Sequence, residues 1–121
     1  MRTPLLVLVA GPYRSGTGDD PTKLAANVDA MNRAALSVYR AGHLPVTGEA
    51  LALPLIELAG SERVGDAVFD EIFHPISRRL LERCDAVLRV GGASAGADEM
   101  VSLAREQGKQ VFTTIAALPP C

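Results

Sequence analysis

The stretch that decides the fold is Leu5-Leu-Val-Leu-Val-Ala10, an unbroken apolar run that ends at Gly11-Pro12. Strands that are buried on both faces of a parallel sheet have continuous apolar runs, whereas half-exposed strands alternate between apolar and polar residues. The run therefore predicts a central strand of a parallel sheet. Because parallel strands are joined by crossover connections, the rest of the chain should alternate between helix and strand.

The remainder of the sequence shows this alternation. Short apolar runs predict strands, and longer segments with apolar residues at helical spacing predict helices. Pro54 is expected to interrupt any single helix within 47–60, so this segment should hold a short helix with a loop on either side. Pro75 is expected to kink the next helix or to mark its boundary. The expected elements are strand 5–10, helix 22–41, strand 43–46, helix 66–83, strand 85–90, helix 97–107 and strand 109–114.

This order predicts a three-layer α/β/α fold of the flavodoxin-like or Rossmann-like type, with a parallel sheet of four or five strands. A chain of 121 residues has the common size of a single domain, so we expect residues 1–121 to form one domain.

Composition excludes several classes of protein. The net charge is −2 and no basic run is present, which argues against a nucleic-acid partner. The longest apolar run is too short to cross a membrane, so no membrane partner is expected. Cys84 and Cys121 have neither metal-ligand spacing nor a disulfide framework. We therefore expect a reducing, cytoplasmic location, no metal and no cofactor.

The first candidate binding loop is Ala10-Gly-Pro-Tyr-Arg-Ser-Gly16, which follows the central strand. Gly11 and Pro12 allow a sharp turn and a close approach of the backbone to a ligand. Tyr13 is expected to stack on a base and Arg14 to meet a phosphate. A strand-ending loop whose glycine and proline serve only the turn is the alternative.

The second candidate loop is Gly91-Gly-Ala-Ser-Ala-Gly96, which follows the third strand and leads into a helix. Backbone amides at a helix start favour an anion, so Gly92, Ser94 and Gly96 are candidate phosphate or sugar contacts. The loop has neither the Walker ending nor the dinucleotide spacing. The alternative is a tight connection in which Ser94 caps the helix. Ligands of open parallel sheets bind where the strand order reverses, which is where both loops are expected.

Four motifs occur in order along the chain, namely Val9-Ala-Gly-Pro-Tyr13, Cys84-Asp-Ala-Val-Leu88, Ser94-x-Gly-Ala97, and Ala104 followed by Gly108-Lys109. Taken together, they resemble the nucleoside 2-deoxyribosyltransferase superfamily over nearly the whole chain. The resemblance implies a flavodoxin-like sheet and a nucleoside pocket over the strand ends, usually completed by a neighbouring subunit. A homodimer or higher homo-oligomer is therefore expected.

The resemblance also implies two carboxylates that this sequence lacks. The nucleophile of active members would fall on Met100, and a second carboxylate would fall on Ser77. A thioether has neither charge nor proton to exchange. The neighbouring acids Glu99 and Asp98 are the candidate catalytic substitutes, although favourable interaction with the helix dipole also explains them.

Three hypotheses follow for the function. The first is a glycosyl transferase or N-glycosidase that acts on a nucleoside or a nucleoside 5′-monophosphate through Glu99 or Asp98. The second is a catalytically inactive nucleotide-binding or sensing module that keeps the pocket. The third is a domain whose main role is oligomer assembly.

Overall fold

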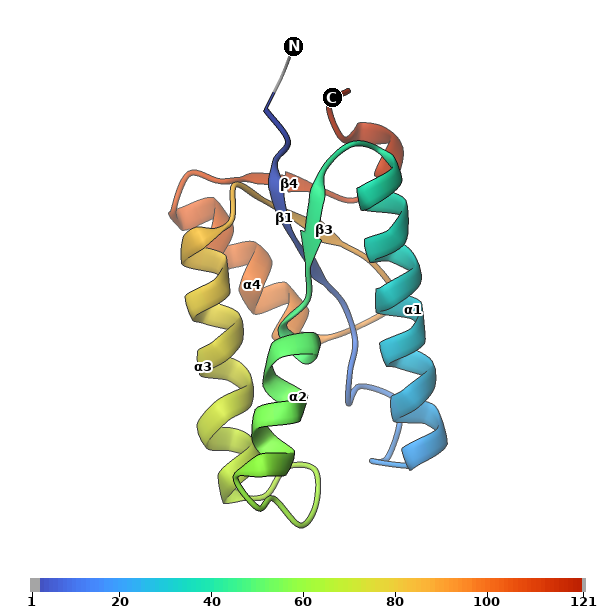
Figure 1. The fold of residues 1–121 in the computed structure, drawn as a ribbon, viewed down its shortest axis with the longest axis vertical. Coiled ribbons are helices and arrows are strands. Elements are labelled where there is room, and N and C mark those ends of the chain that lie inside the picture. The colour runs from blue at the N-terminus through green and yellow to red at the C-terminus, as the bar shows by residue number, and fades with distance from the viewer. Residues whose placement is uncertain (1–2, 121) are drawn as a thin grey trace.

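The computed structural model describes residues 3–120, which form a three-layer α/β fold with a four-stranded parallel sheet and four helices (Figure 1). No helix within these residues is long and apolar enough to cross a membrane. The elements are β1 (Leu6–Ala10), α1 (Pro21–Arg40), β2 (Leu44–Val46), α2 (Gly48–Leu58), α3 (Ala67–Arg83), β3 (Ala86–Arg89), α4 (Ala95–Glu106), β4 (Gln110–Phe112) and a 3₁₀ turn, η1 (Ile115–Ala117).

The strand order in the sheet is β2-β1-β3-β4, and all neighbouring strands run parallel. The predicted central strand is confirmed, because β1 pairs with β2 on one side and with β3 on the other. The chain moves outward from β1 to β2, then crosses back to β3 and continues to β4. The strand order therefore reverses between β1 and β3, and the two candidate loops follow these two strands.

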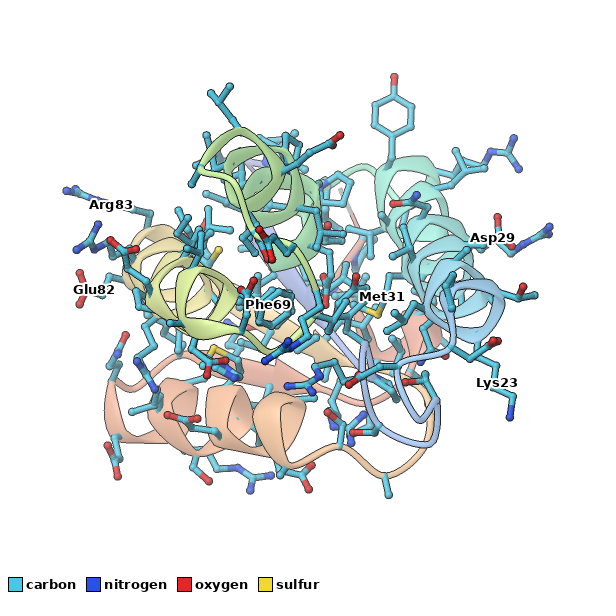
Figure 2. All side chains as sticks on the ribbon, turned by 90° about the horizontal axis from the view of Figure 1, so that it is seen from below. Lys23, Asp29, Met31, Phe69, Glu82 and Arg83 are labelled. Atoms are coloured by element: carbon cyan, nitrogen blue, oxygen red, sulfur yellow. The ribbon has the colours of Figure 1, made fainter. Side chains whose placement is uncertain are left out.

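Side chains of β1 alternate between two apolar layers. Val7 and Val9 pack with Met31 and Val38 of α1, whereas Leu8 packs with α3, α4 and Val87 of β3. In Figure 1, α1 lies on one side of the sheet and α3 with α4 on the other. Figure 2 views the molecule from below, and there Met31 points inward from α1 while Lys23 and Asp29 point outward.

The expectation about Pro54 is wrong, because α2 is one helix that runs from Gly48 to Leu58 through this proline. Proline removes a single i→i−4 hydrogen bond, and Pro54 lies on the exposed side of the helix. The opposite side buries Ala52 and Ile56 against Phe69 and Phe73 of α3. This packing outweighs the lost hydrogen bond.

The helix after β3 begins earlier than predicted. It starts at Ala95 instead of Ala97, so Gly96 lies inside the first turn. Ser94 is the N-cap, and its Oγ accepts a hydrogen bond from the Ala97 amide at 3.1 Å. The small residues of 91–97 do not identify the helix start, because their composition favours a turn equally well.

Helix α3 also contains a proline, and it continues through Pro75 as one helix with Asp66 as its N-cap.

Candidate functional site

The two candidate loops lie against each other at the carboxyl ends of β1 and β3. A Cβ atom on Gly11 would lie 2.7 Å from Met31 Sδ and 2.9 Å from the Val90 carbonyl oxygen. A Cβ atom on Gly91 would lie 2.7 Å from Pro12 Cδ. Gly11 is therefore needed for the packing of its loop between α1 and β3. This requirement is independent of any ligand.

A cavity of about 160 Å³ opens beside these loops. Its inner wall is apolar and comes from β1 and α4, and its outer part carries aromatic, hydroxyl and charged side chains. Five of the seven predicted binding residues line it, namely Gly11, Tyr13, Arg14, Ser94 and Gly96. The other lining residues are Leu8, Val9, Ala10, Ser15, Gly48, Glu49, Phe73, His74, Ser77, Ala97 and Met100.

Pro12 and Gly92 lie elsewhere. They line a shallower groove beside the cavity, which shares Ser15 and Ser94 with it. The Gly92 carbonyl accepts a hydrogen bond from Arg89 Nη2 at 2.8 Å. The two predicted loops therefore lie together, but Pro12 and Gly92 line the neighbouring groove instead of the cavity.

Aromatic rings form one side of the cavity. The Tyr13 ring stacks on Phe73 with 5.3 Å between the ring centroids, and Phe73 stacks on Phe69 at 4.8 Å. In Figure 2, Phe69 points from α3 toward the middle of the molecule. Burial, and then the negative charge of Glu49, raises the pKa of the Tyr13 hydroxyl. Tyr13 is therefore held by its neighbours and keeps its proton at neutral pH.

Arg14 already has an internal partner. Its Nε and Nη2 donate hydrogen bonds of 2.9 Å to the two carboxylate oxygens of Asp19 in the same loop. These bonds raise the pKa of the guanidinium and lower that of the Asp19 carboxyl. The guanidinium also lies 5.7 Å from the centre of the Phe69 ring. Arg14 is half-exposed at the cavity, so it remains open to an anion on its other side.

Glu49 is the carboxylate that the sequence analysis did not single out. It occupies the second position of α2, where Thr47 caps the helix by accepting from the Ala50 amide at 3.1 Å. Its exposed fraction is 8%, and it lines the cavity. Burial raises the pKa of its carboxyl, and a hydrogen bond from its own backbone amide opposes this in part.

Close packing between α2 and α3 positions Glu49 at the cavity. A Cβ atom on Gly48 would overlap Ser77 Oγ and lie 3.3 Å from Ser77 Cβ. The absence of a side chain at Gly48 thus lets the first turn of α2 rest directly on α3. His74 of α3 lies one turn before Ser77 and faces Gly96 of α4, whose built Cβ would lie 3.6 Å from His74 Cε1.

The two predicted catalytic acids point away from the cavity. Glu99 Oε1 pairs with Arg78 Nε at 3.2 Å, and Asp98 Oδ1 pairs with Arg89 Nε at 3.1 Å. Neither residue lines the cavity, whereas Met100 does and is 4% exposed. The positions that the resemblance assigns to carboxylates, Met100 and Ser77, therefore both face the cavity without a carboxylate.

A positional signal for Glu49 was present in the sequence. Thr47-Gly48-Glu49 follows β2, and the carboxyl ends of parallel strands share one edge of the sheet. A polar residue directly after any strand therefore belongs to the same edge as the two glycine-rich loops. Sequence alone does not say which of these side chains turns inward.

No group of three or more His, Cys, Asp or Glu residues suited to a metal gathers within residues 3–120. A scan against protein-family models finds no match to the chain, and a search of curated proteins finds no similar sequence. The resemblance to nucleoside 2-deoxyribosyltransferases therefore stays a hypothesis that the quoted motifs alone support.

Proposed function

We propose that the chain binds a nucleoside or a nucleoside 5′-monophosphate in the cavity at the ends of β1 and β3. The observation that carries the proposal is that two loops far apart in the sequence line one cavity with aromatic, cationic and hydroxyl groups. Pockets that combine an apolar wall with a few convergent polar groups are the usual sites for small ligands.

The size and the exposure of the lining favour one orientation of such a ligand. A cavity of about 160 Å³ accommodates a single ring, since cavities of about 150 Å³ hold benzene. Leu8, Ala97 and Met100 form the buried end, whereas Arg14 and Ser15 are exposed. We infer that a base or sugar ring enters beside Tyr13, and that the phosphate stays at the mouth near Arg14.

Calorimetric titration with deoxyribonucleosides, ribonucleosides and their 5′-monophosphates tests this proposal. We expect monophosphates to bind more tightly, and Arg14→Ala to weaken them about 10- to 100-fold, because hydrogen bonds to charged groups contribute about 1.5–3 kcal/mol. Arg33→Ala is the matched control, since Arg33 also pairs with an aspartate but lies on the exposed side of α1. Absence of binding for every compound at millimolar concentration would overturn the proposal.

A catalytically inactive sensing module is the second candidate, and a specific observation favours it. Met100 and Ser77 face the cavity where the resemblance expects catalytic carboxylates, while Glu99 and Asp98 are held in surface ion pairs. Under this hypothesis the ligand would bind with the same residues and leave unchanged. Glu49 is the one feature of the cavity that favours an enzyme instead.

We also propose that the chain forms a homodimer, and exposed apolar side chains support this proposal. Large apolar side chains are exposed on α1, β2 and α2, namely Leu36, Tyr39, Leu44, Leu51, Leu55 and Leu58. Light scattering should show a dimer that Leu58→Glu dissociates, and a monomer at every concentration would overturn this assignment.

The free, buried thiol of Cys84 supports a reducing compartment such as the cytoplasm.

A further inference from the structure

The carboxylate of Asp19 occupies an anion-binding edge of Arg14. Arg14 is the single arginine or lysine among the residues that line the cavity. Its Nε and Nη2 each donate a hydrogen bond of 2.9 Å to one carboxylate oxygen of Asp19. Arginine binds phosphates and carboxylates with the same pair of parallel hydrogen bonds. The Asp19 carboxylate therefore stands where a phosphate oxygen pair would otherwise bind.

The loop between β1 and α1 bends sharply to bring Asp19 onto Arg14. Asp19 has a φ of 60° and is the one non-glycine residue with a positive φ within residues 3–120, while Gly16 and Gly18 in the same loop also have positive φ. The buried Thr17 fastens the bend, because its Oγ1 donates to the Arg14 carbonyl at 2.6 Å and accepts from the Asp19 amide at 3.0 Å. The left-handed region is unfavourable for a residue with a Cβ atom, so this backbone conformation opposes the ion pair.

The Arg14 guanidinium also has contacts that do not depend on Asp19. A Cβ atom on Gly65 would lie 2.6 Å from Arg14 Nη2 and 2.8 Å from Cζ, so the backbone of Gly65 packs directly against the guanidinium. The centre of the Phe69 ring lies 5.7 Å from Arg14 Cζ, within the range of a cation–π interaction. Two elements outside the loop, the segment 59–66 and α3, therefore hold the guanidinium at the cavity independently of Asp19.

The ion pair itself is weak enough for a ligand to break. The side chains of Arg14 and Asp19 are 44% and 40% exposed, and ion pairs in contact with water contribute little to stability. Asp19 does not line the cavity, so its carboxylate can leave Arg14 without disturbing a ring bound there. An anion that is anchored by such a ring is held beside Arg14 at a high effective concentration.

We propose that Asp19 is a specificity-determining residue that competes with the phosphate of the ligand for Arg14. The inference rests on the proposed function, because it requires a phosphorylated ligand in the cavity. Competition lowers the affinity for every anion by the same factor. A nucleoside monophosphate keeps the contacts of its ring with the apolar end of the cavity, whereas a free anion depends on Arg14 alone. Asp19 thus excludes free phosphate and similar small anions, and it admits a phosphate that is attached to a ring.

The charges around Arg14 determine the direction of the effect. The hydrogen bonds to Asp19, and then the negative charges of Asp19 and Asp70, raise the pKa of the guanidinium. The same negative charges repel an incoming anion. Removal of the Asp19 charge should therefore strengthen anion binding. A residue that only positioned the guanidinium would have the opposite effect, because its replacement would weaken binding.

Calorimetric titration of Asp19→Asn tests the inference. Asparagine keeps the shape of the side chain and tolerates a positive φ, so the substitution removes the charge alone. The ligands are nucleosides, their 5′-monophosphates and inorganic phosphate. We expect Asp19→Asn to bind the monophosphates about 3- to 10-fold more tightly than the wild type, and the nucleosides with unchanged affinity. Inorganic phosphate should remain far weaker than the monophosphates in both proteins.

Two further variants control for charge and folding. Asp29→Asn is the matched control, because Asp29 pairs with Arg33 on the exposed side of α1, and it should leave every affinity unchanged. Asp19→Gly removes the carboxylate and suits the positive φ, so it should show the same gain as Asp19→Asn. Thermal unfolding checks that each variant is folded.

The possible outcomes separate the inference from the proposed function. If the wild type binds monophosphates, an unchanged or weaker affinity in Asp19→Asn and Asp19→Gly would overturn the inference and leave the proposed function intact. An equal gain in Asp29→Asn would also overturn the inference, because it would assign the effect to overall charge. Inorganic phosphate that binds the wild type as tightly as the monophosphates would do the same. Absence of binding by every compound would overturn the proposed function itself.

Discussion

The contact between Gly48 and Ser77 provides a quantitative test of how closely the first turn of α2 packs against α3. Gly48→Ala adds a methyl group that overlaps Ser77 Oγ and lies 3.3 Å from Ser77 Cβ. Rotation of the hydroxyl relieves part of the overlap, at the expense of its 3.4 Å hydrogen bond to the Phe73 carbonyl. Overpacking of this kind costs about 1–3 kcal/mol. Replacement of a glycine by alanine in the middle of a helix returns about 0.5–1 kcal/mol, and this is an upper bound for Gly48, which is the first residue of α2.

These two contributions predict a net destabilisation of about 1 kcal/mol for Gly48→Ala. In a Ser77→Gly background both side-chain atoms are gone, and the nearest atom is the Cα at residue 77, 3.7 Å from the built methyl carbon. The same substitution should then be neutral or stabilising, which gives a coupling free energy of about 1–2 kcal/mol.

Urea unfolding of the four proteins of this cycle measures the coupling. The midpoint should fall for Gly48→Ala alone, while the slope of the unfolding free energy against urea stays constant. An equal effect of Gly48→Ala in both backgrounds would refute the packing argument. In the wild-type background the displaced first turn of α2 should also move Glu49, so that ligand affinity falls together with stability.

Two further predictions concern ionisable groups outside the cavity. The pKa of Asp66 is held well below its usual range, first by the hydrogen bond from the Phe69 amide, so its contribution to stability is lost as pH falls below about 4. Asp66→Asn should flatten the acid limb of stability against pH, and an unchanged limb would contradict this origin. Burial raises the pKa of the Cys84 thiol to about 11, so in a Cys121→Ser protein Ellman's reagent should react with it only after denaturation. Rapid reaction of the native protein would show that the thiol is accessible.

The architecture could be predicted from the sequence, because buried positions carry apolar residues and their spacing distinguishes strands from helices. The apolar run 5–10 marks β1, since a strand covered on both faces has no polar side to show. Asp20, Pro21 and Gly42 mark the ends of α1 through cap chemistry that depends only on local residues. The prediction that Pro54 interrupts the helix was wrong, because local propensity does not include the packing of α2 on α3.

The candidate site was predicted less completely than the fold. Its two loops were found because glycine-rich turns after strands are visible in the sequence. The position of Glu49 directly after β2 placed it at the same edge of the sheet, but its burial among residues from three other segments is recorded by no local pattern. Glu99 and Asp98 were favoured by their positions beside Met100, yet a step of one residue on a helix turns a side chain by about 100°. The structure shows both in surface ion pairs.

The most direct test of the central claim is a titration of the ¹⁵N-labelled protein with nucleoside 5′-monophosphates, followed by backbone amide chemical shifts. We predict saturable changes that concentrate at residues 11–15, at Gly48 and Glu49, at residues 73–77 and at residues 94–97, the four segments that meet at the cavity. A second surface groove lies after β4 and is lined by Thr113, Thr114 and Ile115. Saturable changes confined to that groove, or no changes at millimolar ligand, would contradict the account.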